Sequence, residues 1–211
     1  DALKFAPAPA WVVPNSIPLD AKPSDAPAVI LLNDQQISFE GHKTVTHNEV
    51  VFRIQNAHGL ALGNLSISWN PSTDSVTVNK LRIRRGEKVI DVLAAGQTFT
   101  TARRETNLEA AMLDGALTAN IQPEGLEVGD IIEFATTIEH SDPVLKGHRE
   151  AHFGQWNFGP IESARVRVIW PTGTKLKVQQ TADLPQAKQT VREGRNVLEI
   201  SARNVQPPIF P

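Results

Sequence analysis

The feature that most constrains the fold of this chain is a series of short segments in which apolar and polar residues alternate. The clearest runs from Ile132 to Ile138, where apolar side chains or threonine occupy every second position. A two-residue period places these side chains on one face of a β-strand. The same alternation, or a short apolar run, recurs at residues 28–33, 37–40, 50–55, 65–69, 76–83, 89–93, 164–170, 176–178 and 198–202.

Turn residues separate these segments, and no helical pattern lies between successive strands. The clearest turns are at residues 40–43, 70–71, 85–87, 171–173 and 193–196. Without helices between the strands, an alternating strand and helix architecture is excluded. The sequence therefore predicts an all-β fold, a large antiparallel β-sandwich of about ten strands.

One predicted strand changes phase in its middle. Val76 and Val78 share one parity, whereas Leu81 and Ile83 share the other. An extra residue near Asn79-Lys80 would return all four side chains to one face, which is the effect of a β-bulge.

A single short helix is expected near residues 106–114. Thr106 and Glu109 have the spacing of a capping box, and Gly115 follows as a left-handed C-terminal residue. A helix of about two turns is too short to be stable alone in water, so we expect it to dock on the sheet.

The two ends of the chain differ from its middle. Residues 1–27 contain six prolines, which predicts an extended arm without regular structure, anchored by residues 11–13. Residues 28–204 form the predicted sandwich domain. The Pro-rich residues 205–211 are expected to be a linker toward a downstream domain.

Charge and composition exclude several classes of function. The net charge is −2, which gives nucleic acid and anionic membranes no general electrostatic reason to bind. The cluster of Arg82, Arg84 and Arg85 is explained by a solvated outer sheet face. No apolar run is long enough to span a bilayer, so we expect no membrane insertion. The absence of cysteine excludes disulfides, thiolate nucleophiles and Cys-bound zinc, and no motif predicts a cofactor.

The segment HREAH holds the one spacing that suggests a metal. His148 and His152 are four residues apart and could share one ion, with His140 or Asp142 as a third ligand. Such a site would support a metal-assisted hydrolase. Arg149 stands where the zincin motif requires glutamate, and a polar loop with solvated histidines explains the segment equally simply.

Aromatic residues occur in a Gly-rich loop at one place. Trp156 and Phe158 could form a recognition surface, for example for carbohydrate, because Trp side chains are frequent anchors at interfaces. The alternative is that they pack the loop onto the edge of the sandwich.

In their order along the chain, five segments resemble a family known to us. They are AVILLNDQQISFEGHKTVTHNEVVFRIQN, LRIRRGEKVIDVL, RRETNLEAAMLDGALTANI, LEVGDIIEFATTIEH and ARVRVIWPTGTKL, which together span most of residues 28–180. The family is a domain of unknown function found N-terminal to transglutaminase-like (papain-like) domains in exported bacterial proteins.

The resemblance implies a β-sandwich in the periplasm or cell envelope, made from a precursor with a signal peptide and followed by a domain with a Cys-His-Asp triad. No catalytic residue carries over, because this chain has no cysteine. The residues that match the family motifs, and that we expect to be structural, are Arg104, Glu105, Asn107, Leu108, Asp114, Gly115, Gly129 and Asp130.

The expected function is therefore that of a non-catalytic module that binds proteins or peptides. Its expected partner is the downstream transglutaminase-like domain or another envelope protein. An edge strand of the sandwich that pairs with an extended peptide is one suitable mode of recognition.

Overall fold

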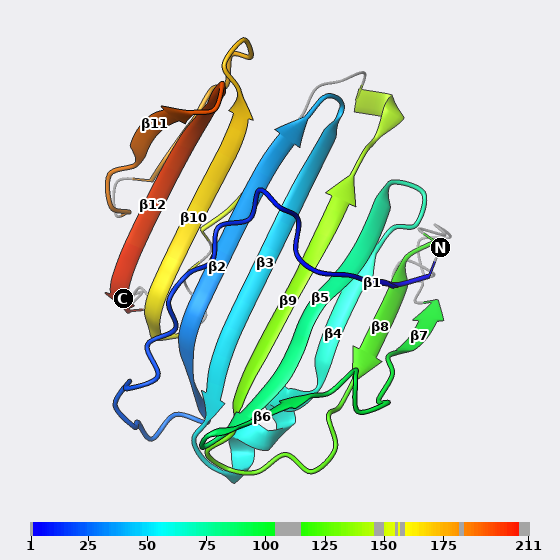
Figure 1. The fold of residues 1–211 in the computed structure, drawn as a ribbon, viewed down its shortest axis with the longest axis vertical. Helices are drawn as coiled ribbons and strands as arrows, with labels where there is room; N and C mark the ends of the chain where they lie inside the picture. Colours follow the sequence, from blue (N-terminus) through cyan, green and yellow to red (C-terminus); the bar gives the residue numbers. More distant parts are fainter. Residues whose placement is uncertain are drawn as a thin grey trace, which may run out of the picture.

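The structure is a computed structural model that describes residues 2–103, 115–145, 150–154, 156, 159–181 and 184–206. The larger of its two sheets has nine strands in the order β1-β5-β9-β3-β2-β10-β12-β11, in which β6 also pairs with β5 (Figure 1). Its strands are β1 (Lys4–Phe5), β2 (Ala28–Glu40), β3 (Lys43–Ile54), β5 (Asp74–Arg85), β6 (Lys88–Asp91), β9 (Ile131–His140), β10 (Ile161–Pro171), β11 (Lys188–Arg192) and β12 (Arg195–Val205).

A second sheet of three strands has the order β4-β8-β7. It consists of β4 (Leu65–Trp69), β7 (Thr100–Arg103) and β8 (Leu117–Ile121). The predicted all-β, sandwich-like class is thus confirmed. The helix expected near residues 106–114 lies outside the described residues. The described residues contain two 3-10 helices, η1 (Ala57–Gly63) and η3 (Pro143–Leu145). No helix among the described residues is long and apolar enough to cross a membrane.

The large sheet is mixed, whereas the sequence predicted an antiparallel one. Strand β2 pairs in parallel with β10 in the middle of the sheet, and β1 pairs in parallel with β5. The other pairs are antiparallel. Hairpin turns specify antiparallel neighbours, but β2 and β10 are separated by most of the chain, so no local signal predicts their pairing.

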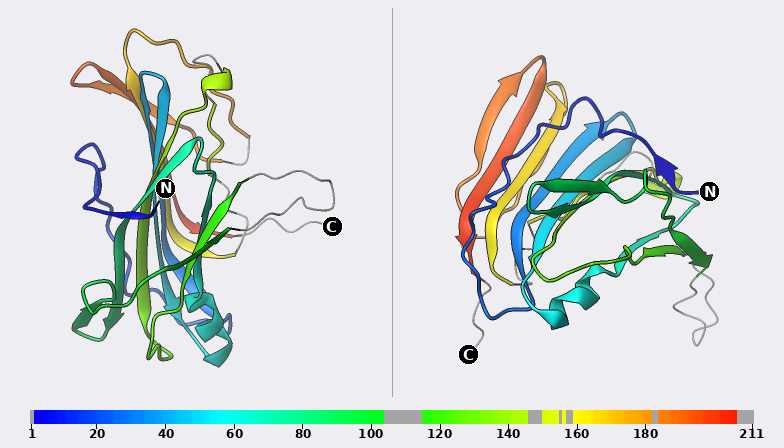
Figure 2. Two further views of the ribbon diagram at one scale, coloured as in Figure 1. Left: turned by 90° about the vertical axis from the view of Figure 1, so that its right-hand side faces the viewer. Right: turned by 60° about the horizontal axis from the view of Figure 1, so that its bottom comes forward.

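The large sheet buries one face, here called the inner face, against two different layers. Over β5, β9 and β3 the second sheet covers it, as Figure 2 shows from the side. Over β10 and β12 the cover comes from two loops, of which residues 151–154, 156, 176–181 and 184–187 are described. The inner face is apolar, with Ile37, Leu81, Ile132, Val166 and Leu198 all buried.

The N-terminal arm, residues 2–27, crosses the opposite face of the large sheet, here called the arm face. Figure 1 shows it in blue, running from β1 across β9, β3 and β2, and Figure 2 shows it on the side away from the second sheet. The arm has no regular structure apart from β1, a strand that the sequence did not predict. Both faces of the central strands are therefore covered.

Several local predictions are confirmed. The register of β5 against β9 shifts between Val78 and Lys80, which is the predicted bulge and brings Leu81 and Ile83 back to the inner face. Gly41 takes a positive φ of 54° in the turn between β2 and β3.

The strand predicted at residues 176–178 is wrong. Leu176 belongs to a loop without regular structure and packs on the inner face beside β10. The spacing of its apolar residues reflects contacts of the loop with the sheet rather than pairing in a ladder.

Candidate functional site

The histidines of the metal hypothesis are not brought together in the described part of the chain. His148 lies outside it, and His152 is exposed. The Nδ1 atom of His140 lies 2.6 Å from Oδ1 of Asp74, while Asp142 accepts a hydrogen bond from the backbone N–H of Val144. Among the described residues, no three His, Asp or Glu side chains are placed to hold one metal ion.

Of the family-motif residues, Gly115, Gly129 and Asp130 are described, and Arg104, Glu105, Asn107, Leu108 and Asp114 lie outside the described residues. The two glycines have positive φ angles of 67° and 97°, respectively, which favour glycine.

Asp130 is buried in the turn before β9, where Arg85 binds both of its oxygens at 2.8 and 2.7 Å and the N–H of Glu127 donates to Oδ2. Burial raises the pKa of Asp130, but these hydrogen bonds outweigh it, so the pKa lies below its ordinary value. The same ion pair raises the pKa of Arg85. Asp130 is therefore an ionised carboxylate, and these hydrogen bonds hold the turn before β9.

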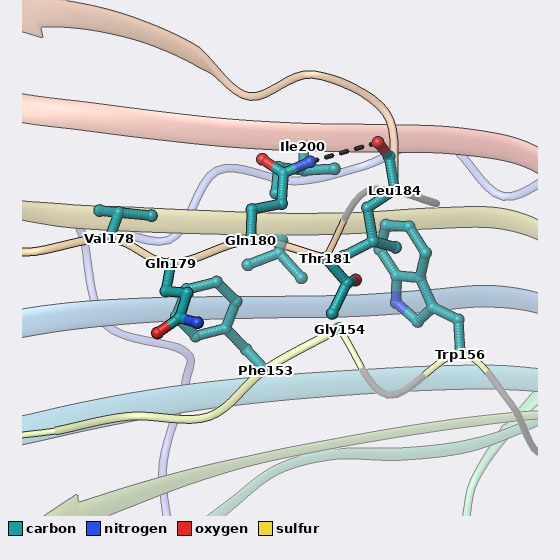
Figure 3. Close-up of a pocket in the computed structure, with 10 residues that line it drawn as sticks. Phe153, Gly154, Trp156, Val178, Gln179, Gln180, Thr181, Leu184 and Ile200 are labelled. Carbon is teal, nitrogen blue, oxygen red and sulfur yellow. Dashed lines mark hydrogen bonds between the residues drawn. The ribbon is translucent and has the colours of Figure 1, made fainter.

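A pocket of about 270 Å³ opens on the inner face beside β10 and β12. Figure 3 shows that its walls come from the two loops and the sheet. It is lined by Phe153, Gly154, Trp156, Val166, Val178, Gln179, Gln180, Thr181, Leu184 and Ile200. None of these described lining residues carries a carboxylate, imidazole, amine or guanidinium, so they offer apolar contact and amide hydrogen bonds but no general acid or base.

Trp156 combines the two roles that the sequence left open. It is only 7 % exposed and packs in the core with the inner face of β10 and β12, so it anchors its loop. It also forms part of the pocket wall. Phe158 lies outside the described residues.

An edge of the large sheet is free beside this pocket. Strand β11 pairs with β12 only from Lys188 opposite Glu199 to Arg192 opposite Arg195. Residues 200–205 of β12 pair with β10 on one side and, in the described structure, have no strand partner on the other. The pocket residue Ile200 is the first residue of this free edge. An unpaired strand edge is a template for another strand.

The arm face carries a buried polar cluster that the sequence did not single out. Arg165 on β10 donates from Nε to Oδ1 of Asp34 at 2.6 Å and from Nη2 to Oδ2 at 2.9 Å. Gln36 donates to the same carboxylate at 2.8 Å. Asp34 is 1 % exposed and Gln36 is fully buried. Arg167 lies beside them, and burial together with the charge of Arg165 lowers the pKa of its guanidinium.

His47 belongs to a chain of hydrogen bonds on the same face. Asn79 donates from Nδ2 to the carbonyl oxygens of Ala6 and Pro7, which fixes the orientation of its amide. The Thr137 hydroxyl then donates to Oδ1 of Asn79 at 2.7 Å. Because this uses the only hydroxyl proton, Nδ1 of His47, 3.1 Å from Thr137 Oγ1, must carry a proton and donate.

Burial lowers the pKa of His47 below its ordinary value of 6.5. Lys80 acts in the same direction, whereas Glu49, Asp34 and the amide of Asn79 raise the pKa and only partly offset burial. His47 is therefore neutral at pH 7.

Other charged residues of the arm face form ion pairs. Arg84 binds Glu133 at 2.8 and 2.6 Å, and Lys80 lies 2.7 Å from Glu49. The prediction of a solvated outer face holds for Arg82, but Arg84 is half-buried beside a buried carboxylate. These pairs leave no carboxylate of the cluster available for acid or base work.

Comparison with known proteins places the chain in a family. The model of a domain of unknown function with a solved structure, DUF3857, matches residues 41–209. The chain belongs to the DUF3857 family. The expected membership of a family of unknown function is thereby confirmed, and the association with transglutaminase-like domains stays a prediction.

The DUF3857 fold has a solved counterpart. It is similar to the crystal structure of a "putative protease" from Parabacteroides distasonis, with a TM-score of 0.71 and 12 % sequence identity. The match covers 88 % of this chain and 37 % of that chain, so the present chain spans little more than a third of its length. At this identity the similarity shows the fold alone. No curated protein matches the chain.

Proposed function

We propose that this DUF3857 domain is a non-catalytic interaction module of an exported protein, and that it binds an extended segment of a neighbouring transglutaminase-like domain or of another envelope protein. The observation that carries the proposal is the apolar pocket on the inner face, whose described lining residues include no titratable group. Its chemistry suits binding and provides no proton transfer.

The size of the pocket favours a protein segment over a free small molecule. Its volume of about 270 Å³ lies below the range of about 300–1,000 Å³ that is usual for ligand pockets, and suits one large apolar side chain. The free edge of β12 begins at Ile200 in the pocket wall. A partner strand that pairs with this edge can place an apolar side chain near the pocket while its backbone bonds to β12.

The wider context supports a role beside a catalytic domain. The structural neighbour is more than twice as long as the matched region and is named a "putative protease". A domain of this kind can serve such a protein by holding a neighbouring domain or a substrate in place. We expect the gene to encode a signal peptide before this domain and a Cys-His-Asp domain after it, which sequencing the complete gene tests directly.

The proposal is tested with the two domains produced separately. Val178 lies in the pocket wall and is 42 % exposed, so Val178→Asp adds a charge there without opening the core. Val128, 53 % exposed in the turn before β9, provides the matched control Val128→Asp. Calorimetric titration with the downstream domain is expected to show binding that Val178→Asp weakens about tenfold or more, since burying one valine contributes about 1.5–3 kcal/mol.

Two results would count against the proposal. If the separated domains neither bind nor change each other's melting temperature, the module does not act through its neighbour. If Val178→Asp and Val128→Asp bind equally well, the pocket is not the point of contact.

A further inference from the structure

The arm face holds the N-terminal arm mainly by its backbone carbonyl oxygens. Side chains from four different strands donate these hydrogen bonds. Asn79 donates to the carbonyl oxygens of Ala6 and Pro7, and Arg167 donates to that of Trp11. Gln36 and Arg165 both donate to the carbonyl oxygen of Val13. Arg53 donates to the carbonyl oxygens of Leu19 and Ala21.

The centre of this surface is built and rigid. The amide of Gln36 accepts from the Val13 N–H at 3.0 Å and donates to the Val13 carbonyl at 2.8 Å, as a neighbouring strand would. Arg165 adds a second donor to the same oxygen at 2.6 Å. Asp34 fixes both donors, and all three side chains are buried. The Val13 side chain is 41 % exposed, so the site recognises the backbone of this residue and not its side chain.

A surface of donors matches the chemistry of a Pro-rich segment. Proline has no N–H, so a segment rich in proline cannot complete a sheet ladder, but it offers carbonyl oxygens along its length. The arm pairs with β5 only at Lys4 and Phe5, before its first proline. From Pro7 onward, side-chain donors of the sheet replace the ladder. Ile17 and Ala21 add apolar contacts to the cluster around Leu32.

We propose that the arm face is a binding site for an extended, Pro-rich segment of another polypeptide, and that the arm is the resident occupant of this site. The bound arm itself shows which chemistry the surface accepts. Because the arm is tethered through a short connection to β2, its effective concentration is about millimolar, and a segment in solution competes poorly until the arm is released. The site lies on the face opposite the pocket, so the two proposals fail or succeed independently.

The experiment uses the full chain with a site-specific protease sequence inserted between Pro23 and Ser24, in an exposed connection. After folding, the chain is cut, and a fluorescent peptide with the sequence of residues 2–21 is added. Fluorescence anisotropy is expected to show saturable binding to the cut chain that the unlabelled peptide reverses. Binding to the uncut chain is expected to be at least about tenfold weaker.

Peptide variants test the mechanism without any change in the domain. N-methylation of Val13 removes the N–H that Gln36 accepts and is expected to weaken binding about five- to tenfold. Val13→Ala alters only an exposed side chain and is the matched control, expected to bind within about twofold of the parent peptide.

Three results would overturn the proposal. The first is a cut chain that keeps its cooperative melting transition but does not bind the peptide. The second is a loss of affinity for Val13→Ala as large as that for N-methylation. The third is an uncut chain that elutes as a dimer and becomes monomeric on cutting, since the arm would then be exchanged between two copies and would not be the resident occupant of its own site.

Discussion

The buried ion pair between Asp34 and Arg165 allows a prediction with a definite sign and size. Arg165 donates two hydrogen bonds to the carboxylate, and both side chains are buried. Asp34→Leu leaves the guanidinium without its counter-ion and removes the acceptor of Gln36. Leaving one member of a buried pair uncompensated costs about 3–5 kcal/mol, so the free energy of unfolding is expected to fall by that amount. Arg165→Met is expected to cost a similar amount.

The double variant distinguishes this reasoning from a simple loss of packing. Replacing both charges by apolar side chains of similar size is often neutral, so Asp34→Leu with Arg165→Met is expected to lie within about 1–2 kcal/mol of the parent. About 1 kcal/mol of that is the lost hydrogen bond to the Val13 carbonyl. Urea unfolding of all four proteins gives their free energies of unfolding, provided that the dependence of this free energy on urea concentration is the same in each. The coupling energy follows from these four values. If the two single losses simply add in the double variant, the pair is not coupled and the argument fails.

Two further predictions concern His47 and Gly59. Because burial lowers the pKa of His47, the unfolded chain takes up this proton first as the pH falls below about 6.5. The free energy of unfolding is therefore expected to decrease with falling pH in that range, and His47→Gln is expected to make this decrease smaller. Urea titrations at pH 7, 6 and 5 measure it, and an equal pH dependence in His47→Gln and the parent would contradict the assignment. A Cβ at Gly59 would clash with the carbonyl oxygen of Pro27, whereas one at Gly173 meets open space. Gly59→Ala is expected to cost about 2 kcal/mol or more in thermal unfolding and Gly173→Ala about 0.5 kcal/mol or less, and equal costs would refute the clash.

The sequence was sufficient to predict those parts of the structure that depend on residues close together in the chain. The alternation in β9 and the phase change near Asn79 each determine their own local geometry, and the bulge lies where the phase change put it. The parallel pairing of β2 with β10 depends on residues far apart in the chain, and no turn or spacing indicates it. Leu176 shows the opposite error, since contact of a loop with a sheet can imitate the spacing of a strand.

The candidate sites were harder to predict because polar residues carry them. In β2, Asp34 and Gln36 lie on the face of the strand opposite Ile37 and Phe39. From the sequence alone, these two polar residues would be assigned to a solvated face. That inference assumes that only one face of the sheet is covered. The arm covers the second face, and it does so through backbone carbonyls, which require polar partners. Polar residues in the middle of a long strand can therefore indicate a face that binds polypeptide backbone.

The same reasoning explains why a charged pair lies beneath the arm when stability does not require it. An apolar pair in place of Asp34 and Arg165 would leave the fold about as stable, but it could not donate to the Val13 carbonyl. The carboxylate holds the guanidinium in the one orientation that leaves Nη2 directed at the arm. The double variant is therefore expected to separate two properties: it keeps nearly the full free energy of unfolding, yet releases the arm more readily. A double variant that is stable and still holds the arm peptide as tightly as the parent would show that the pair has no part in binding.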